Sequence, residues 1–383
     1  MSSATVGSSE APRSVYVHVP FCAHHCGYCN FTVTAGHDDL IGTYLEAVER
    51  EMSWLAQPQP VDTIFLGGGT PSHLPAEQLA QLLASVRKWF PPEGDYEWSV
   101  EANPNDLDDA RAGLLAEYGV TRVSLGAQSF DPAKLKVLER DHSADEIARA
   151  VNRCIAMGID VSVDLIFGAP GESLEVWHDD LSAALALAPQ HISTYGLTYE
   201  KGAAFWGRRQ RGELQQASEE LERAMYLDGI DWLSSAGFEH YEVSNFALPG
   251  HACRHNDAYW DGRQYFAVGP GASRHIDNRR ETNHRSTTAY LSRVLAGQSP
   301  VAESETLSAE TKAREILVFG LCRLRGVSRR RFTDRTGMEI DSLVGEPLKR
   351  FVSLGLLEDA EGRVRLTREG LLVSDSLWPE FLG

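Results

Sequence analysis

The chain has 383 residues, of which 43% are hydrophobic, and a formal net charge of −18. This acidic excess disfavours a nucleic-acid partner, because phosphate binding uses clustered lysine and arginine side chains. No segment reaches the roughly 20 apolar residues of a membrane span, and nothing at the N-terminus resembles a signal peptide. We therefore expect a cytoplasmic protein with one large α/β domain and a smaller appendage.

The small, polar residues 1–13 predict a disordered tail. Residues 14–243 alternate short apolar runs with amphipathic stretches, which is typical of a parallel sheet with right-handed crossovers. The expected strands are 15–19, 63–69, 97–102, 122–127, 160–168 and 191–197, and the expected helices are 40–56, 76–89, 107–118, 143–157 and 173–187. Six repeats predict a partial, TIM-like (β/α)6 barrel, in which functional residues lie at the C-terminal ends of the strands.

Residues 244–286 are rich in Tyr, Trp, His and Asn without helical periodicity, so we expect a loop-rich connection there. Helical patterns return in 287–383, which predicts a smaller, mostly helical C-terminal domain. Its expected elements are helices at 287–296, 308–323, 328–336, 343–353 and 367–376, with a hairpin-like segment at 356–366. A local cluster of arginines within 323–331 is interpreted as a solvated face.

Three cysteines within eight residues, Cys22, Cys26 and Cys29, form a C-x3-C-x2-C pattern after the first expected strand. Thiolates hold iron–sulfur clusters, and a four-iron cluster with three protein ligands leaves one iron free for an exchangeable small molecule. We expect that molecule to be S-adenosylmethionine. A structural zinc site completed by His24 or His25 is the alternative, although zinc sites usually pair two C-x2-C units. Six cysteines in a chain of this length do not make a disulfide scaffold.

Glycines and polar residues follow the other expected strands. The turn 67–70, Gly-Gly-Gly-Thr, suits the amino-acid end of a cofactor, because glycine lets a backbone approach a ligand closely. Glu101, Gln128 and Asp164 lie at or near the ends of the next three strands. Each alone reads as a surface residue or helix cap, but three on successive strands favour a cofactor mouth. Arg140 is long enough to reach a carboxylate, and a surface role is equally compatible with its position.

Segment 253–260 places a histidine among aromatic residues. His255 is followed by Tyr259 and Trp260, which is typical of a haem ligand with aromatic walls. The alternative is that His255 and Asn256 stabilise a loop by hydrogen bonds, and spacing alone favours this second interpretation.

Six ordered motifs resemble those of radical S-adenosylmethionine proteins. They are YVHVPFC with its cysteine loop, GGGTPS, SVEANP, SLGAQSF, LERDH and DLIFGAPGES. More narrowly, they resemble the oxygen-independent coproporphyrinogen oxidase group and, within it, the HemW haem chaperone branch. The resemblance runs from about residue 14 to the C-terminus. It implies a radical-type core over 14–243, a haem-binding connection over 244–286 and a HemN/HemW-type domain over 287–383.

The resemblance also implies cofactors and their ligands. Cys22, Cys26 and Cys29 would bind three irons of a [4Fe-4S] cluster, while S-adenosylmethionine chelates the fourth. The residues implied to line the S-adenosylmethionine site are Tyr16, Tyr28, Gly68, Gly69, Thr70, Glu101, Gln128, Arg140, Asp164 and Gly196. In such proteins the reduced cluster splits the sulfonium to a 5′-deoxyadenosyl radical, and the protein orients the cofactor and excludes water.

Two departures distinguish the branches. The decarboxylating oxidases resemble C-x3-C-x2-C-x-C, but this chain has Asn30 and Phe31 after the triad. The HemW branch resembles H-N-x-x-Y-W, which residues 255–260 match, and this implies that His255 binds haem. Residues 273–274, Ser-Arg after VGPGA, depart from the histidine–serine that the resemblance leads us to expect.

Two hypotheses follow. The first is a haem chaperone that hands haem to an acceptor such as a respiratory cytochrome, with transient contact to a membrane complex. The second is a radical enzyme acting on a porphyrinogen, or a related methyltransferase. The missing fourth cysteine and the H-N-x-x-Y-W motif favour the first. The sequence leaves open the acceptor, the oligomeric state, whether S-adenosylmethionine is consumed, and whether haem attaches covalently. Cys253, two residues before His255, is an alternative thiolate ligand.

Overall fold

The computed structural model describes residues 11–383. Residues 1–10, most of the tail predicted over 1–13, lie outside the described residues. Arg13, the last residue of that predicted tail, bonds through its guanidinium to Asp62 at 2.6 Å and to Glu93 at 2.8 Å. Arg13 is therefore attached to the barrel.

Six parallel strands form the core of the molecule. They are β1 (Ser14–Val19), β4 (Val61–Gly68), β5 (Pro92–Ala102), β6 (Arg122–Gln128), β7 (Asp160–Phe167) and β8 (His191–Gly196), paired in this order. Each overlaps a predicted strand, because a parallel strand covered on both faces is a nearly continuous run of Val, Ile and Leu. The predicted partial (β/α)6 barrel is confirmed.

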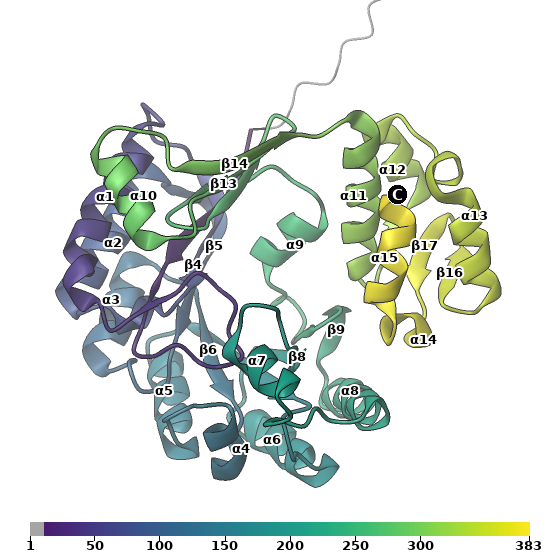
Figure 1. Cartoon of the computed structure of the whole chain (residues 1–383), viewed down its shortest axis with the longest axis horizontal. Helices are drawn as coiled ribbons and strands as arrows, with labels where there is room; N and C mark the ends of the chain where they lie inside the picture. The colour runs from purple at the N-terminus through teal and green to yellow at the C-terminus, as the bar shows by residue number, and fades with distance from the viewer. Residues whose placement is uncertain (1–10) are drawn as a thin grey trace, which may run out of the picture.

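Helices cover the outer face of the sheet (Figure 1). They are α1 (Ile41–Ser53), α2 (Ala76–Trp89), α3 (Asp109–Tyr118), α4 (Pro132–Val137), α5 (Ala144–Ala156), α6 (Leu174–Ala186) and α8 (Glu219–Ser235), and the short α7 (Ala204–Gln210) lies near the first loop. In α5, the buried Ile147, Val151 and Cys154 recur at helical spacing. Ser143 and Glu146 start this helix with a capping box, in which each side chain bonds to the other's backbone N–H.

The segment 244–286 completes both edges of the sheet. Strand β10 (Asn245–Ala247) pairs antiparallel with β8 and with β9 (Glu239–Glu242), and β11 (Phe266–Val268) pairs parallel with β1. Between them lies helix α9 (Arg254–Trp260), where the sequence predicted a loop. The prediction of a loop-rich connection is therefore corrected at this point, because seven residues are too few to show helical periodicity.

The next residues remain with the barrel. Helix α10 (Thr287–Leu295) packs against α1, and its Tyr290, Leu291 and Val294 belong to the barrel core. Strands β12 (Ser273–Ile276), β13 (Arg279–Asn283) and β14 (Val301–Thr306) form a separate antiparallel sheet. The boundary predicted at residue 287 therefore lies too early, because a second hydrophobic core begins only at Ala313.

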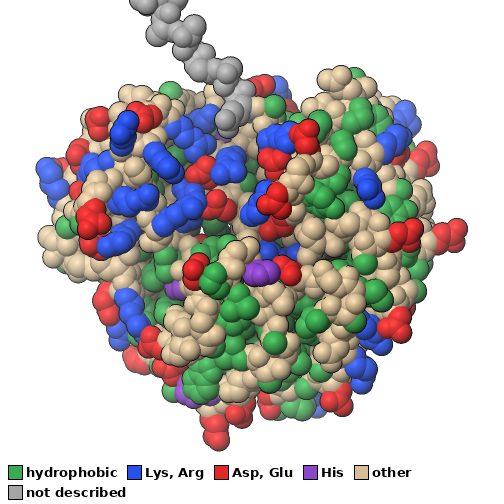
Figure 2. Space-filling view, turned by 180° about the vertical axis from the view of Figure 1, so that it is seen from behind, with side chains coloured by type: hydrophobic (Ala, Val, Ile, Leu, Met, Phe, Trp, Pro, Cys, Tyr) green, Lys and Arg blue, Asp and Glu red, His purple; other side chains and the backbone are tan. Residues whose placement is uncertain are grey.

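That second core belongs to a C-terminal domain at the right of Figure 1. It contains α11 (Ala309–Cys322), β15 (Val327–Ser328), α12 (Arg329–Thr336), α13 (Ile340–Ser353), β16 (Leu357–Ala360), β17 (Arg363–Leu366), α14 (Arg368–Leu371) and α15 (Ser374–Leu382). Figure 2 shows lysine and arginine side chains gathered at the upper left, where this domain lies in that view. Across residues 11–383, no helix combines the length and apolarity needed to cross a membrane.

Candidate functional site

The cysteine loop leaves the C-terminal end of β1. Cys22 lies in β2 (Phe21–Cys22), which pairs with β3 (Thr34–Ala35), and the N–H of Cys29 donates to the carbonyl of Cys26 at 3.0 Å. All three cysteines are free thiols. Burial raises the pKa of Cys22 to about 12 and also raises the pKa of Cys29. Because metal ligation requires thiolates, binding a metal at this loop releases protons.

Two residues outside the predicted set hold the loop in place. The N–H of Gly27 donates to the Glu139 carboxylate at 2.8 Å, and the N–H of Phe205 in α7 donates to the carbonyl of Gly27 at 2.7 Å. A Cβ at Gly27 would lie 2.3 Å from the Phe205 ring, so only glycine fits here. Glu139 and Phe205 act through contacts with residues far away in the chain, and the sequence carries no local signal for such contacts.

The glycine turn after β4 is bonded to the cysteine loop. The N–H of Gly69 donates to the carbonyl of Val19 at 2.8 Å, and the N–H of Thr70 donates to the carbonyl of Phe21 at 2.7 Å. A Cβ at Gly69 would lie 2.5 Å from the Val19 oxygen. The hydroxyl of Thr70 lies 3.4 Å from the Cys22 sulfur. The two predicted motifs therefore form one unit.

Two carboxyl groups lie in the mouth of the barrel. Glu101 accepts a hydrogen bond from the N–H of Gly68 at 2.8 Å, and Asp164 accepts one from the hydroxyl of Ser124 at 2.8 Å. Burial raises the pKa of Glu101 to about 8, and the Asp164 charge adds to this rise. Burial raises the pKa of Asp164 to about 6, against the hydrogen bonds of neighbouring serines. A cationic ligand at this position would favour their ionised forms.

Arg140 reaches the same region from the loop after α4. Its Nη2 donates to Asn103 Oδ1 at 2.7 Å and to the Gly126 carbonyl at 3.0 Å, and its Nη1 lies 3.7 Å from the Cys26 sulfur. Among residues 11–383, its buried Nε finds no hydrogen-bond partner. Asn103 was not predicted as a site residue, and it orients Arg140 toward the thiol.

The remaining predicted residues lie at the same end of the barrel. Gln128 ends β6 in the left-handed conformation, with φ of 64°, where the register with β7 shifts. The hydroxyl of Tyr16 lies 3.0 Å from His18 Nδ1. Tyr28 packs edge to face on Phe205, with 6.1 Å between ring centroids. Gly196 ends β8 and is exposed.

The donor set suits an iron–sulfur cluster better than one zinc ion. Each cysteine of such a cluster binds a different iron, so three thiols on one loop meet its requirement. Within the described range 11–383, no three His, Cys, Asp or Glu side chains converge on one ion. His24 Nε2 is bonded to the Glu139 carbonyl, and His25 Nε2 lies 3.1 Å from the Cys29 carbonyl. His24 Nε2 also lies 3.3 Å from the Cys26 sulfur, so the zinc alternative has one histidine beside the thiols and rests on ligand number rather than on distance.

Helix α9 occupies the opposite end of the barrel. The Glu97 carboxylate accepts hydrogen bonds from the N–H groups of Arg254 and His255, each at 3.0 Å, and lies 3.1 Å from the Arg122 guanidinium. Glu97 lies on β5 four residues before Glu101, and Arg122 begins β6. The H-N-x-x-Y-W helix is thus bonded to the N-terminal ends of strands whose C-terminal ends carry the cofactor-mouth residues.

His255 is enclosed in this arrangement. It is 1% exposed, its Nδ1 lies 2.9 Å from the Thr63 hydroxyl, and its Nε2 lies 2.9 Å from the Tyr259 hydroxyl. Its ring also packs on Phe65, with 5.3 Å between centroids. Both ring nitrogens are therefore engaged in this conformation. Ligation of iron by His255 would require one of these hydrogen bonds to break.

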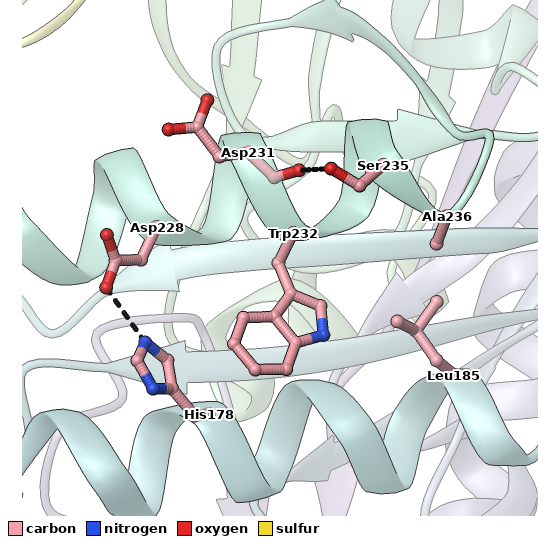
Figure 3. Close-up of a pocket in the computed structure, with 7 residues that line it drawn as sticks. All are labelled: His178, Leu185, Asp228, Asp231, Trp232, Ser235 and Ala236. Carbon is pink, nitrogen blue, oxygen red and sulfur yellow. Dashed lines mark hydrogen bonds and ion pairs between the residues drawn. The ribbon is translucent and has the colours of Figure 1, made fainter.

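A hollow of about 510 Å³ lies between α6 and α8, away from both ends described above. Figure 3 shows His178 directed at Asp228, with a 2.8 Å bond, and the Trp232 ring beside it. The two rings stack with 4.8 Å between centroids. None of the predicted site residues lines this hollow, so it is not part of the candidate site.

Two family models match parts of the chain. The radical SAM superfamily model matches residues 16–184, and the HemN C-terminal domain model matches residues 307–373. The chain is 34% identical to the heme chaperone HemW of Bacillus subtilis, over 97% of this chain and 99% of that protein. The chain belongs to the HemW family.

Other HemW proteins show similar coverage. The Mycobacterium tuberculosis relative is 37% identical over 97% of this chain and 95% of its own length. The Escherichia coli relative is 33% identical over 97% of this chain and 98% of its own length. The HemW-family fold is shared with the solved coproporphyrinogen III oxidase (HemN) of Escherichia coli, a radical SAM enzyme. That structure has a TM-score of 0.84 and 21% identity, covering 97% of this chain and 90% of HemN.

Proposed function

We propose that this chain is a haem chaperone. It binds a [4Fe-4S] cluster and S-adenosylmethionine at the C-terminal end of the barrel, binds haem beside α9, and transfers the haem to an acceptor protein in the cytoplasm. Membership of the HemW family supports the haem part of this proposal. The three thiols and the two carboxyl groups of the barrel mouth support the cofactor part.

The separation of the two ends carries the proposal. Glu97 at α9 and Glu101 in the mouth are four residues apart on β5, which corresponds to about 13 Å of extended strand. The rings of Tyr16 and Phe65 lie between, with centroids 6.2 Å apart, and Phe65 packs on His255. A macrocycle beside α9 would therefore be separated from the barrel mouth by these rings. This favours a carrier over an enzyme that modifies the macrocycle.

The residues of the mouth have defined tasks in this proposal. The cluster and S-adenosylmethionine, when bound, supply one-electron cleavage of the sulfonium. The carboxyl groups of Glu101 and Asp164 balance the positive charge of the ammonium and sulfonium groups. The Arg140 guanidinium, whose Nη1 lies 3.7 Å from the Cys26 sulfur, places a positive charge beside the cysteine loop. The bonds of Gly69 to β1 and of Thr70 to β2 fix the cysteine loop against the glycine turn.

The second candidate is an oxidase acting on a porphyrinogen in the barrel mouth. The C-x3-C-x2-C-x-C pattern of such oxidases requires a cysteine at position 31, where this chain has Phe31, which is 69% exposed. Protein reconstituted with iron and sulfide under anaerobic conditions tests both candidates. We expect a shifted Soret band on titration with haem and no turnover of coproporphyrinogen III. Turnover without haem binding would contradict the chaperone assignment.

Transfer is tested separately. We expect haem loaded on the protein to appear in an added apo-cytochrome of the respiratory chain, either free or in membrane vesicles. The two proteins are separated after mixing, and the haem in each is measured by absorbance. Retention of all haem on the donor, under conditions where free haem enters the same acceptor, would argue against a transfer function.

A further inference from the structure

A polar cluster lies next to the Asp164 carboxyl group of the barrel mouth. Successive side chains of a strand point to opposite faces, so Ser162 and Asp164 share one face of β7, and His191 and Ser193 share one face of β8. In the pairing of these strands Ser162 is in register with His191, and Asp164 with Ser193. Ser162, His191 and Ser193 are at most 3% exposed. The carboxyl group is therefore adjoined by buried polar groups on its N-terminal side.

Hydrogen bonds join this cluster into a chain that ends at α9. Asp164 Oδ1 lies 3.3 Å from Ser162 Oγ, and Ser162 Oγ lies 2.8 Å from His191 Nδ1. His191 Nε2 lies 2.8 Å from the Tyr241 hydroxyl, which accepts from the N–H of Cys253 at 3.2 Å. The chain therefore runs through the barrel from the cofactor mouth to the N-cap residue of α9.

An ionised Asp164 fixes the place of every proton in this chain. A carboxylate only accepts, so the Ser162 hydroxyl donates to Asp164 and has no proton left for His191. Nδ1 of His191 must then donate to Ser162. Burial and then the Arg122 charge lower the pKa of His191 well below its ordinary value, so the ring is neutral and its Nε2 accepts from the Tyr241 hydroxyl. All donors of the chain thus point toward Asp164.

Further groups act on the same carboxyl group. Ser124 Oγ donates to Asp164 Oδ2 at 2.8 Å, and Ser193 Oγ lies 3.4 Å from Ser162 Oγ. The hydrogen bonds of these three serines lower the pKa of Asp164, so that burial raises it only to about 6. The other titratable or charged groups facing Asp164 or His191 are Glu101 on β5, Arg122 on β6, Tyr195 on β8 and Tyr241 on β9.

We propose that Ser162 and His191 are positioning residues, which keep Asp164 an ionised acceptor for the positive charge of the cofactor. This inference rests on the proposed binding of S-adenosylmethionine in the barrel mouth. Donors that are already oriented toward a carboxylate stabilise its charge without reorganisation when a cation arrives. Without them, the buried Asp164 takes up a proton more readily and loses its attraction for a cation.

The test is calorimetry of S-adenosylmethionine binding to the full-length protein, reconstituted anaerobically with its cluster. Ser162→Ala removes a donor to Asp164 and raises the pKa of this carboxyl group. We expect roughly five- to tenfold weaker binding than in the wild type at about pH 6.5, and equal binding at about pH 8.5, where Asp164 is ionised in both proteins. A merely structural role of Ser162 would weaken binding equally at both pH values.

Matched variants isolate the hydrogen-bond chain. Ser99 on β5 is fully buried, and its hydroxyl has no hydrogen-bond partner among residues 11–383, so Ser99→Ala should bind as the wild type does at both pH values. Asp164→Asn removes the charge and should bind weakly at both. His191→Leu should resemble Ser162→Ala, whereas His191→Asn offers an amide N–H to Ser162 and should resemble the wild type.

The outcomes separate this inference from the proposed function. A wild-type protein that binds no S-adenosylmethionine at either pH defeats the cofactor part of the proposed function and this inference with it. Wild-type binding by Ser162→Ala at both pH values overturns the inference alone. So does a loss that the higher pH does not relieve, in a variant with an unchanged melting curve. A loss in Ser162→Ala that His191→Leu does not share overturns the assignment of His191.

Discussion

Glu101 and Asp164 are carboxyl groups whose protonation is changed by their place in the barrel mouth. Both carboxyl groups have raised pKa values, of about 8 and about 6, mainly because the barrel shields them from water. The hydrogen bonds that these carboxyl groups accept from serine hydroxyls and from the N–H of Gly68 lower the pKa values, but by less than burial raises them. At neutral pH the Glu101 carboxyl is therefore largely protonated and the Asp164 carboxyl largely ionised, and a cation that favours the ionised form of Glu101 binds with release of a proton.

The Glu101 shift makes stability depend on pH. Between its ordinary pKa of 4.5 and its folded value of about 8, only the unfolded chain loses the Glu101 proton. The free energy of unfolding therefore falls as pH rises through this window. We expect the melting temperature of cluster-free Glu101→Gln to fall less between pH 5 and pH 8 than that of the wild type. The exposed control Glu346→Gln follows the wild type, and parallel curves for all three proteins would refute this assignment.

The glycine turn offers a steric prediction. Gly69→Ala places a Cβ 2.5 Å from the Val19 oxygen, a backbone atom that cannot rotate away. We expect a loss of about 1–3 kcal/mol in stability and loss of S-adenosylmethionine binding, measured by thermal unfolding and calorimetry. Gly113→Ala in α3, where a Cβ meets nothing within 4 Å, should gain up to about 1 kcal/mol. Equal effects of the two substitutions would contradict the turn's role.

At the scale of elements, α9 is held by the barrel more than by its own sequence. It has only seven residues, and the side chain of its N-cap residue, Cys253, accepts no hydrogen bond from the N–H groups of the first turn. The Glu97 carboxylate serves this purpose by accepting from two of its N–H groups. An acidic group at a helix N-terminus also interacts favourably with the helix dipole.

Removing Glu97 should therefore release α9. Glu97→Ala leaves two helix donors and the buried Arg122 without their partner, at a cost of roughly 3–5 kcal/mol. We expect a lower melting temperature and faster amide hydrogen exchange over residues 253–260. Asp95→Ala is the matched control, because Asp95 is fully exposed and forms one ion pair, at 3.4 Å, with the side chain of Arg254, without bonding to the backbone of α9. Unchanged exchange in Glu97→Ala would show that α9 is held by other contacts.

At the scale of the whole molecule, arginines of the C-terminal domain bind the barrel through α9. The sequence suggested a solvated face for this cluster, but Arg323 and Arg325 pair with Asp257 and Asp261. Arg330, by contrast, has a side chain that is 92% exposed. The cluster therefore joins two parts of the molecule instead of facing only water.

These ion pairs should limit the access of haem to α9 under the proposed function. Arg325→Ala removes one of them, and we expect haem to associate several-fold faster, with less dependence on salt. Stopped-flow absorbance measures the rate. Arg330→Ala, in the same cluster but without a partner on α9, should match the wild type. A slower association in Arg325→Ala would indicate that the arginine attracts haem instead of limiting its access to α9.

The sequence predicts the barrel well because its signals are local. The strands are buried apolar runs, and motifs at their ends lie together once the sheet is parallel, as Cys22, Thr70 and Glu101 do. Helix α8 was missed because its charged residues dilute the apolar pattern. The place of α9 depends on pairing of β10 and β11 with opposite sheet edges, which no local pattern encodes.

The account's central claim is that haem and the cluster occupy opposite ends of one barrel. The variant in which Cys22, Cys26 and Cys29 are all alanine tests it most directly, by iron content and haem titration of the same preparation. We predict no cluster absorption and no S-adenosylmethionine binding, together with a wild-type Soret band and haem affinity. Loss of haem binding along with the cluster, in a variant with unchanged far-ultraviolet circular dichroism, would contradict the claim.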